Sequence, residues 1–482
     1  QMLTRSWAIV VCSAALIAAS ATDRSPSRGR RLAWLSPWFG SLIMGQQPSR
    51  VLRDNEMAST HRTLQAAQLH LPNRNQVVQL ALVGDCMTGR LLDQVLPHPI
   101  PNEVEHGRSI SALGDHLRAG LGVRGLSDTN KLERVWGTTL PLFKEADARL
   151  INLETSVTTS DTPWPSKVFH YRMHPQNIDL LKVIGCDYAS SANNHILDYG
   201  YEGMEETMKA LREAGIKFAG VGKDANEAFR PVEVPVKGHP ISLLVFSFSD
   251  HGAGRADKEG LDTWAATEDR KGLNYLDVDD INERQITQLA HKMRDLKREL
   301  ERERGSGHTV LSVLSIHWGP NYRWHPSHQQ TMIAHKLIDE GGVDIVHGHS
   351  SHHIQGIELY KARPIIYGAG DFLDDYATDD EYRNDLGMMY FVHLHKDEPT
   401  KVSHLTLAPT FVDRMSVNRL LTSDSARRSD YDWLLAKFRE LCSRHKTPVY
   451  EDPSKSEWHI PVNLEEAKTT TTATTTTTTS EL

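Results

Sequence analysis

The chain has 482 residues, enough for two or three average domains or for one large α/β domain with extensions. Hydrophobic residues make up 39% of it, which allows a sizeable core, and the net charge of −8 argues against a nucleic-acid-binding surface. The four cysteines lie far apart and form no CxxC pair, which argues against a disulfide framework and a thiolate zinc site.

Residues 1–75 are predicted to be a leader outside the folded domain. Arg5 precedes the apolar run "WAIVVCSAALIAA", and Ala19-Ser20-Ala21 offers a small-residue cleavage site, as in a secretion signal. The alternative is an unstructured leader. The run is short for a membrane span. The protein is therefore expected to be secreted or membrane-anchored through this segment, and otherwise cytoplasmic. No other stretch is expected to cross a membrane.

Residues 76–415 are predicted to form one α/β domain. "VVQLALVGDC" and "ADARLINLETS" predict strands, and "QNIDLLKVIG" predicts a helix closed by Gly185, followed by a strand that ends in "SSANNHILDYG". Further on, "HTVLSVLSIHWG", "GVDIVHGHSSHH" and "RPIIYGAGDFLDDY" predict strands that end in histidines or acids. One face of a long helix is indicated by the apolar residues Ile286, Leu289, Met293, Leu296 and Leu300. Strands that alternate with helices are typical of α/β folds.

The C-terminal part is predicted to consist of a helical extension over residues 416–454 and a disordered tail over residues 455–482. The run from Thr469 to Thr479 is threonine broken only by Ala473, so it has no apolar face to pack. A chain of residues 76–454 is therefore expected to fold on its own.

Five predicted strands end in side chains that can bind a metal ion. These side chains are Asp85, Glu154, Asn194 with His195, His317, and His349 with His352. In α/β folds the loops at the carboxyl ends of strands converge on one crevice, so distant residues can meet there. Carboxylate, amide and imidazole donors together suit divalent metals such as Mn, Fe or Zn. Two such ions, roughly 3.5–4 Å apart, can clamp both oxygens of a displacement at phosphorus.

Each of these residues also has an ordinary structural interpretation. Gly84-Asp85 fits a turn, Glu154 fits a capping or salt-bridging acid, and Asp198 fits a helix N-cap. His317 fits a satisfied core histidine, and "GHSSHH" fits a surface loop. The recurrence of donors at strand ends is what favours a metal site.

The motifs "GDCMTGR", "INLETSVT", "SSANNHILDYG", "IHWGPNY" and "HGHSSHHIQGIELY" resemble those of the CapA-type poly-γ-glutamate capsule-synthesis proteins. That family is similar to the calcineurin-like metallophosphoesterases. The resemblance covers about residues 77–415. It implies a two-layer β sandwich flanked by helices, with one or two divalent metal ions at the sheet edge.

The resemblance also implies roles for individual residues. Asp85 and His352 would hold the first metal, and Glu154 would bridge in place of the superfamily's usual aspartate. The second metal would be held by Asn194, His317 and His349. His195 would protonate the leaving group.

Asp198, three residues after His195, is expected to orient its imidazole and to raise its pKa. Two departures from the family pattern bear on the metal ligands. Met87 stands where the superfamily usually has a histidine, and Ser350-Ser351-His352-His353 stands where the commoner capsule-family loop has a His-Pro-His core.

Three functions remain open from the sequence. The chain is interpreted as a metal-dependent hydrolase of phosphoesters, as a non-catalytic accessory protein whose metal binds polymer carboxylates, or as a hydrolase of γ-glutamyl amides. The expected partner is a small molecule or an anionic polymer, and not nucleic acid.

Overall fold

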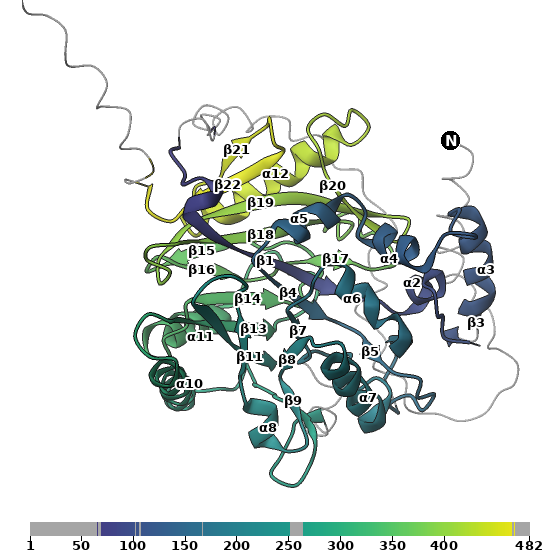
Figure 1. Ribbon diagram of the computed structural model, residues 1–482, viewed down its shortest axis with the longest axis horizontal. Coiled ribbons are helices and arrows are strands. Elements are labelled where there is room, and N and C mark those ends of the chain that lie inside the picture. Colours follow the sequence, from purple (N-terminus) through teal and green to yellow (C-terminus); the bar gives the residue numbers. More distant parts are fainter. Residues whose placement is uncertain are drawn as a thin grey trace, which may run out of the picture. The chain divides into compact units, whose positions relative to one another are not determined.

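The computed structural model describes residue 65, residues 69–101, 103–105, 108–165, 167–250 and 264–464, and residue 467. Two β-sheets packed face to face form the centre of this part of the chain (Figure 1). The apolar N-terminal run and the threonine-rich run lie outside the described residues. Within the described part, no helix combines the length and the hydropathy needed to cross a membrane.

The larger sheet has ten strands in the described residues. Its neighbouring strands are, in order, β21 (Tyr450–Asp452), β22 (Glu457–Pro461), β19 (Val402–Asp413), β18 (Leu386–His395), β1 (Val77–Cys86), β4 (Ala148–Leu153), β7 (Tyr188–Ser190) and β8 (Lys217–Ala219). In addition, β17 (Asp371–Leu373) pairs with β1, and β20 (Ser416–Arg419) pairs with β19. Strands β1, β4, β7, β8 and β17 are parallel, so their carboxyl ends share one edge of the sheet.

The smaller sheet has six strands in the described residues. Their order is β10 (Val232–Pro235), β11 (Ile241–Ser249), β13 (Thr309–His317), β14 (Ile345–His349), β16 (Arg363–Ile366) and β15 (Ile357–Tyr360). Strands β11, β13, β14 and β16 are parallel and also end on one edge. Short two-stranded pairs are β2 (Val104–Glu105) with β3 (Arg108–Ser109), β5 (Ser156–Val157) with β6 (Arg172–Met173), and β9 (Val221–Gly222) with β12 (Gly272–Leu273).

The main core lies between the two sheets and follows from the alternation of side chains along each strand. Leu80 of β1, Leu243 of β11 and Val313 of β13 point into it, while Ala81 and Phe246 belong to the outer layers. The larger sheet is covered on its outer face by α2 (Arg90–Val95), α3 (Ile110–Gly120), α4 (Asp128–Trp136), α5 (Leu140–Glu145) and α6 (Asp179–Val183). The smaller sheet is covered by α10 (Glu283–Arg304) and α11 (His328–Asp339) (Figure 1). The predicted two-layer sandwich flanked by helices is therefore confirmed.

The remaining helices connect or close these layers. They are α7 (Gly200–Glu213), α8 (Ala225–Phe229) and α12 (Arg428–Ser443), and the 3-10 turns η2 (Arg74–Gln76), η3 (Gly137–Thr139) and η4 (Pro175–Ile178) precede β1, α5 and α6. The long helix predicted from the apolar spacing is α10, which begins with a capping box at Asn282. Gly185 follows α6 with φ +68°, a left-handed backbone that favours glycine, as predicted for a helix end.

The predicted C-terminal boundaries are wrong. The extension over residues 416–454 contains α12, but it also contains strands β20 and β21, which pair with the larger sheet through β19 and β22. Residues 457–461 of the predicted tail form β22, and Trp458 is fully buried. These residues form a strand because their side chains alternate in direction. Trp458 and Ile460 face the core, while His459 faces the other way.

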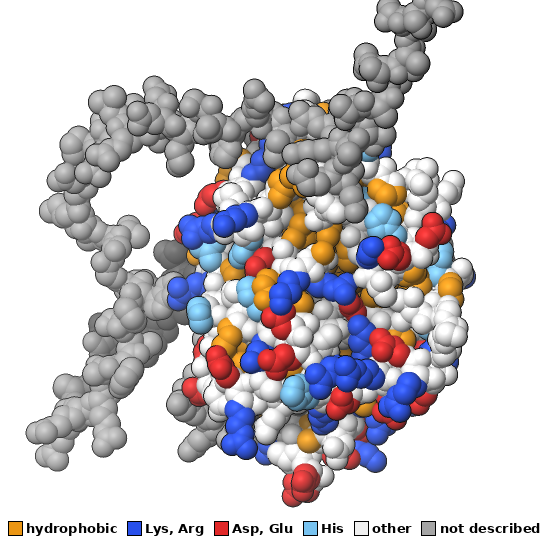
Figure 2. All heavy atoms as spheres, turned by 90° about the vertical axis from the view of Figure 1, so that its left-hand side faces the viewer, with side chains coloured by type: hydrophobic (Ala, Val, Ile, Leu, Met, Phe, Trp, Pro, Cys, Tyr) orange, Lys and Arg blue, Asp and Glu red, His pale blue; other side chains and the backbone are white. Residues whose placement is uncertain are grey.

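The surface on the side of β15, β16 and α10 carries mixed charge. Figure 2 shows Lys and Arg side chains interleaved with Asp and Glu on this face, with hydrophobic side chains scattered between them. A face of this kind does not form the single-sign basic field that attracts nucleic acid.

Three buried histidines on adjacent strands of the larger sheet, β18, β19 and β22, form a cluster away from the carboxyl ends of the parallel strands. The rings of His393 and His404 stack with centroids 4.1 Å apart. The hydroxyl of Thr406 lies 2.9 Å from His393 Nε2 and 3.1 Å from His459 Nδ1. Burial lowers the pKa of His393 to about 3, lowers that of His459 to about 4, and lowers that of His404 well below its ordinary value.

This cluster predicts a loss of stability in acid. A histidine with a lowered folded-state pKa stabilises the fold above about pH 6.5, and this stability is lost as the pH falls from there toward the folded-state pKa. At pH 5 each such histidine lowers the free energy of unfolding by up to about 2 kcal/mol. Urea unfolding at pH 7.5 and pH 5 measures the difference. His393→Gln should reduce it, whereas His116→Gln, at an exposed position on α3, should leave it unchanged. An equal pH dependence in both variants would contradict the assignment.

Candidate metal centre

The carboxyl ends of the parallel strands of both sheets come together at one place. In the larger sheet Asp85 of β1 is in register with Asn152 of β4, and in the smaller sheet His317 of β13 is in register with His349 of β14. His347 Nε2 donates a hydrogen bond to the carbonyl of Val83 over 2.9 Å, which ties the two sheets together beside this edge. The predicted convergence of donors at strand ends is therefore found.

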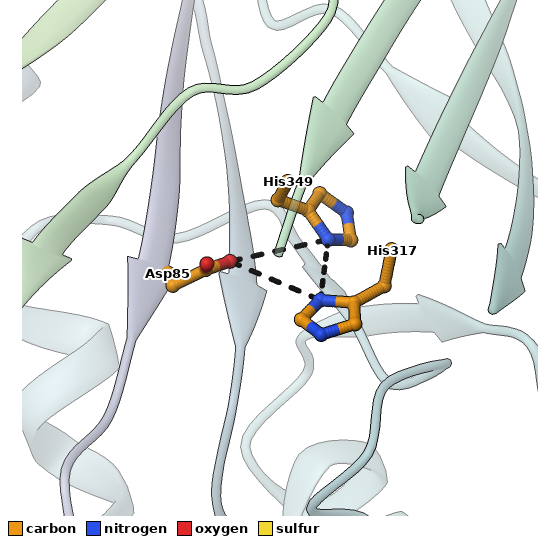
Figure 3. Close-up of side chains that lie close together, drawn as sticks. All are labelled: Asp85, His317 and His349. Carbon is orange, nitrogen blue, oxygen red and sulfur yellow. Dashed lines mark hydrogen bonds and ion pairs between the residues drawn. The ribbon is translucent and has the colours of Figure 1, made fainter. Parts of the chain in front are cut away.

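A first group of possible ligands consists of Asp85, His317 and His349 (Figure 3). Asp85 Oδ1 lies 4.0 Å from His317 Nδ1 and 3.9 Å from His349 Nδ1, and the two Nδ1 atoms are 2.9 Å apart. Exposure of each of the three residues is 1% or less. Figure 3 shows the two rings and the carboxylate turned toward one another from three strand ends, which is an arrangement that one cation can join.

A second group consists of Asp85, Glu154, His352 and Asp371. One ligand atom from each residue lies within 4.8 Å of the others. His352 Nδ1 donates to Asp371 Oδ1 over 2.8 Å. Asp85 is common to both groups, and Glu154, the expected bridging residue, also lies near the first group, with Oε1 3.8 Å from His317 Nε2.

The buried carboxylates fit a divalent cation. Both side-chain oxygens of Glu154 are buried and have no hydrogen-bond partner among the described residues. Burial, and then the nearby charge of Asp85, raise the pKa of Glu154 and of Asp371 well above their ordinary values. A buried carboxylate without donors is costly unless a cation or a proton satisfies it. The donors present therefore suit a metal ion, whose identity they leave open.

The two adjacent asparagines at the end of β7 have different roles. Asn193 is structural: its Nδ2 donates to Asn152 Oδ1 over 3.1 Å and to the carbonyl of Leu153 over 2.8 Å, and its Oδ1 accepts from the backbone N–H of His195. Asn194 Oδ1 is buried with no hydrogen-bond partner among the described residues, so this oxygen is free to face a cation, and its role as a ligand stays a prediction.

Asn152 was not predicted as a site residue, although it stands in the motif "INLETS". Its Nδ2 donates to Asp85 Oδ1 over 2.7 Å and lies 3.3 Å from His317 Nδ1. Because its own Oδ1 is held by Asn193, the amide fixes the orientation of Asp85. Asn152 could be recognised only from the fold, because it lies opposite Asp85 in the pairing of β4 with β1.

His195 lies beside the metal-ligand groups. Its Nδ1 is 2.6 Å from Asp198 Oδ2, and its Nε2 is 3.9 Å from Glu154 Oε1. The predicted orienting contact with Asp198 is therefore present. The net direction of the predicted pKa change is wrong, however, because burial lowers the pKa of His195 to about 4 even though Asp198 alone would raise it.

Two further residues hold this imidazole, and neither was predicted. Lys167 Nζ contacts Asp198 Oδ1 at 2.5 Å and donates to the carbonyl of Phe169 at 2.9 Å. Tyr171 stacks on His195 with ring centroids 4.1 Å apart, and its backbone N–H donates to Asp198 Oδ2. Burial alone would raise the pKa of Asp198, but His195 and Lys167 bring it below its ordinary value, so Asp198 is held as a carboxylate.

Comparison with known proteins identifies the family. Residues 79–376 match the family model described as bacterial capsule synthesis protein PGA_cap, which is more than half of the chain. This chain belongs to the bacterial capsule synthesis protein family. The predicted resemblance to capsule-synthesis proteins is confirmed.

Several relatives of this family member carry names. A probable polyglutamine synthesis accessory protein of Mycobacterium tuberculosis strain H37Rv is 33% identical over 383 residues, which cover 78% of this chain and 94% of the relative. The capsule biosynthesis protein CapA of Bacillus anthracis is 26% identical, with 58% and 62% covered. The PGA biosynthesis protein CapA of Bacillus subtilis is 24% identical, with 66% and 78% covered.

The residues of the histidine loop have different places relative to the two groups. Ser350 and His352 both have positive φ, +99° and +61°, which side chains other than glycine rarely adopt. The turn lets the backbone N–H of Ser350 donate to Asp85 Oδ2 over 3.1 Å and brings His352 to the second group. His353 instead bonds the carbonyl of Ile354 and packs on Trp324, outside both groups.

Met87 is fully buried, and its sulfur accepts a hydrogen bond from the backbone N–H of Gly89 over 3.3 Å. A thioether is a soft ligand and does not suit Mn²⁺ or Mg²⁺. A metal ion in the place that the superfamily's histidine would serve therefore needs its other donors from elsewhere in the chain.

Proposed function

We propose that this capsule-synthesis family protein is a metal-dependent hydrolase that acts on phosphoester-type bonds of a small anionic or polymeric substrate. The observation that carries the proposal is that two metal-ligand groups share Asp85, with the imidazole of His195 beside them. A scaffold that only bound a cation would have no need for an oriented imidazole next to Glu154.

In this proposal the residues of the site fall into metal ligands and a proton-transfer group. Asp85, His317 and His349 would hold one ion, and Asp85, Glu154 and His352 a second. Divalent ions there would polarise a phosphoryl oxygen and supply a nucleophile at neutral pH. Asp198 and Lys167 fix the Nδ1 side of His195, so that Nε2, which faces Glu154, is the ring nitrogen that exchanges a proton with the reacting groups.

A second candidate function is supported by the names of the relatives. The Mycobacterium tuberculosis relative is named an accessory protein, and the Bacillus subtilis relative is named for PGA biosynthesis. In this alternative the metal centre binds the carboxylates of an anionic polymer without turnover. A hydrolase of γ-glutamyl amides would use the same groups, because a metal centre that polarises a phosphoryl oxygen also polarises a carbonyl.

The metal centre itself gives the first test. Purified protein is expected to bind at least one divalent metal ion, and Mn²⁺ added at about 100 times its dissociation constant should stabilise the fold by about 2.7 kcal/mol. Asp85→Asn and His317→Ala should lower the metal content without unfolding the chain, because the first removes a negative charge from both groups and the second removes one imidazole from the first group. Metal analysis and thermal unfolding measure both effects.

His328→Ala, at an exposed position on α11, is the matched control and should keep its metal. Phosphomonoesters, phosphodiesters and a γ-glutamyl anilide, each tested with Mn²⁺, then separate the three functions. Protein that carries no metal and gains no thermal stability from Mn, Fe or Zn would contradict the metal centre. A metal-loaded protein that hydrolyses none of these substrates would favour the accessory function.

A further inference from the structure

Asp371 stands next to Asp85 because β17 inserts beside β1. The two strands are parallel, and Asp85 is in register with Asp371. The backbone N–H of Asp85 donates to the carbonyl of Gly370 over 2.9 Å, which fixes the two aspartates side by side. The side chain of Asp371 is fully buried, and Asp85 is 1% exposed. Two adjacent buried carboxylates repel each other unless a cation lies between them.

No lysine or arginine within the described residues forms an ion pair with Glu154 or Asp371. Within the described residues, the ion pairs of Glu154 are with His195 and His317, and that of Asp371 is with His352. The unpartnered oxygens of Glu154 are an independent sign that a ligand belongs here.

We propose that Asp371 is a direct ligand of the metal ion at Asp85, Glu154 and His352, and that it makes this the manganese-selective position of the centre. The inference rests on the metal centre of the proposed function. Three carboxylates and one imidazole form an oxygen-rich set, which suits Mn²⁺. The other position has two imidazoles and one carboxylate, which suit Zn²⁺ or Fe. The chain therefore offers two unlike metal positions that share Asp85.

The competing interpretation is that Asp371 only orients His352. A carboxylate that accepts the N–H of a metal-bound histidine is common around metal sites, and the 2.8 Å contact between Asp371 Oδ1 and His352 Nδ1 would serve that purpose. The two roles differ in their dependence on charge. An orienting acceptor works as well when it is an amide, whereas a ligand that neutralises Mn²⁺ must be charged.

Asp371→Asn separates the two roles because it keeps the shape and the acceptor oxygen but removes the charge. Metal-free full-length protein is titrated with Mn²⁺ and with Zn²⁺. We expect Asp371→Asn to bind Mn²⁺ more than about 100-fold more weakly, beyond the effect of a residue that only orients a ligand, and to keep its Zn²⁺. His317→Ala should show the opposite, losing Zn²⁺ and keeping Mn²⁺. Without metal, Asp371→Asn should melt no lower than the wild type, because the substitution relieves the repulsion with Asp85.

Three results would overturn the inference: Asp371→Asn with Mn²⁺ affinity within about 100-fold of the wild type, wild-type protein that takes up Zn²⁺ but no Mn²⁺, or a metal-free variant that melts below the wild type. If Asp85→Asn and His317→Ala also leave metal binding unchanged, the metal centre of the proposed function fails as well, so the two failures are distinguishable. Should Asp371→Asn not fold, X-ray absorption of manganese in the wild type decides, and two or more imidazoles per Mn²⁺ would overturn the assignment.

Discussion

Truncation after residue 454 is expected to abolish cooperative folding, whereas truncation after residue 468 is expected to leave it intact. The shorter chain lacks β22, which pairs with β19 from Trp458 opposite Leu407 to Pro461 opposite His404. Without it, β19 keeps β18 on one side but loses its other neighbour over that stretch, and β21 loses its only paired strand among the described residues. The core between the sheets is then open at this end.

Trp458 accounts for much of the expected effect. It is fully buried, its Nε1 donates to Tyr431 Oη over 2.9 Å, and its ring stacks on Phe438 with centroids 5.6 Å apart. Removing a buried tryptophan side chain costs about 3–5 kcal/mol, out of about 5–15 kcal/mol for a whole domain. The truncation also removes Ile460 from the same core.

Calorimetry and near-ultraviolet circular dichroism of the two truncated chains measure the effect. Trp458→Ala in the full-length chain is the single-residue version and should lower the free energy of unfolding by about 3–5 kcal/mol. The longer truncated chain is the control, because it removes only the threonine-rich end. If the chain ending at residue 454 melts cooperatively at the midpoint of the longer one, β22 does not stabilise the fold.

The sequence predicted the strand ends well because each is marked locally. An apolar run followed by an acid, an amide or a histidine identifies Asp85, Glu154, His317 and His349, and all four lie where the parallel strands end. Parallel strands then bring their carboxyl ends to a common edge whatever their separation in the chain. The candidate metal site could therefore be predicted without knowing the order of the strands.

The residues that were missed depend on long-range packing. Asp371 joins the site only because β17 pairs in parallel with β1, and no local pattern shows that pairing. Lys167 comes from an irregular loop between β5 and β6, so no periodicity points to it. The pKa of His195 follows from burial, which depends on the whole fold, and burial outweighs the predicted effect of Asp198.

His195→Ala is expected to keep its metal and to lose turnover by about 10²–10⁴-fold on whichever phosphoester proves to be a substrate, the range typical of a general acid or base. The ring is not a member of either metal-ligand group, yet its Nε2 lies 3.9 Å from Glu154 Oε1. The other ring nitrogen of His195, Nδ1, is hydrogen-bonded to Asp198, and the ring of Tyr171 stacks on the face of the imidazole. Metal analysis and steady-state kinetics on the same preparation measure the two effects separately.

The dependence on the leaving group then assigns the proton. If His195 protonates the leaving group, as the family resemblance implies, the loss should be large for alkyl esters and small for nitrophenyl esters, whose leaving groups need no proton. Equal losses on both would assign the ring to the attacking water instead. His353→Asn is the matched control, because it removes a buried histidine that contacts Trp324 and neither metal group. Full activity of His195→Ala on alkyl esters would remove the catalytic role, leave Asn194 as the functional residue of this loop, and favour the accessory function.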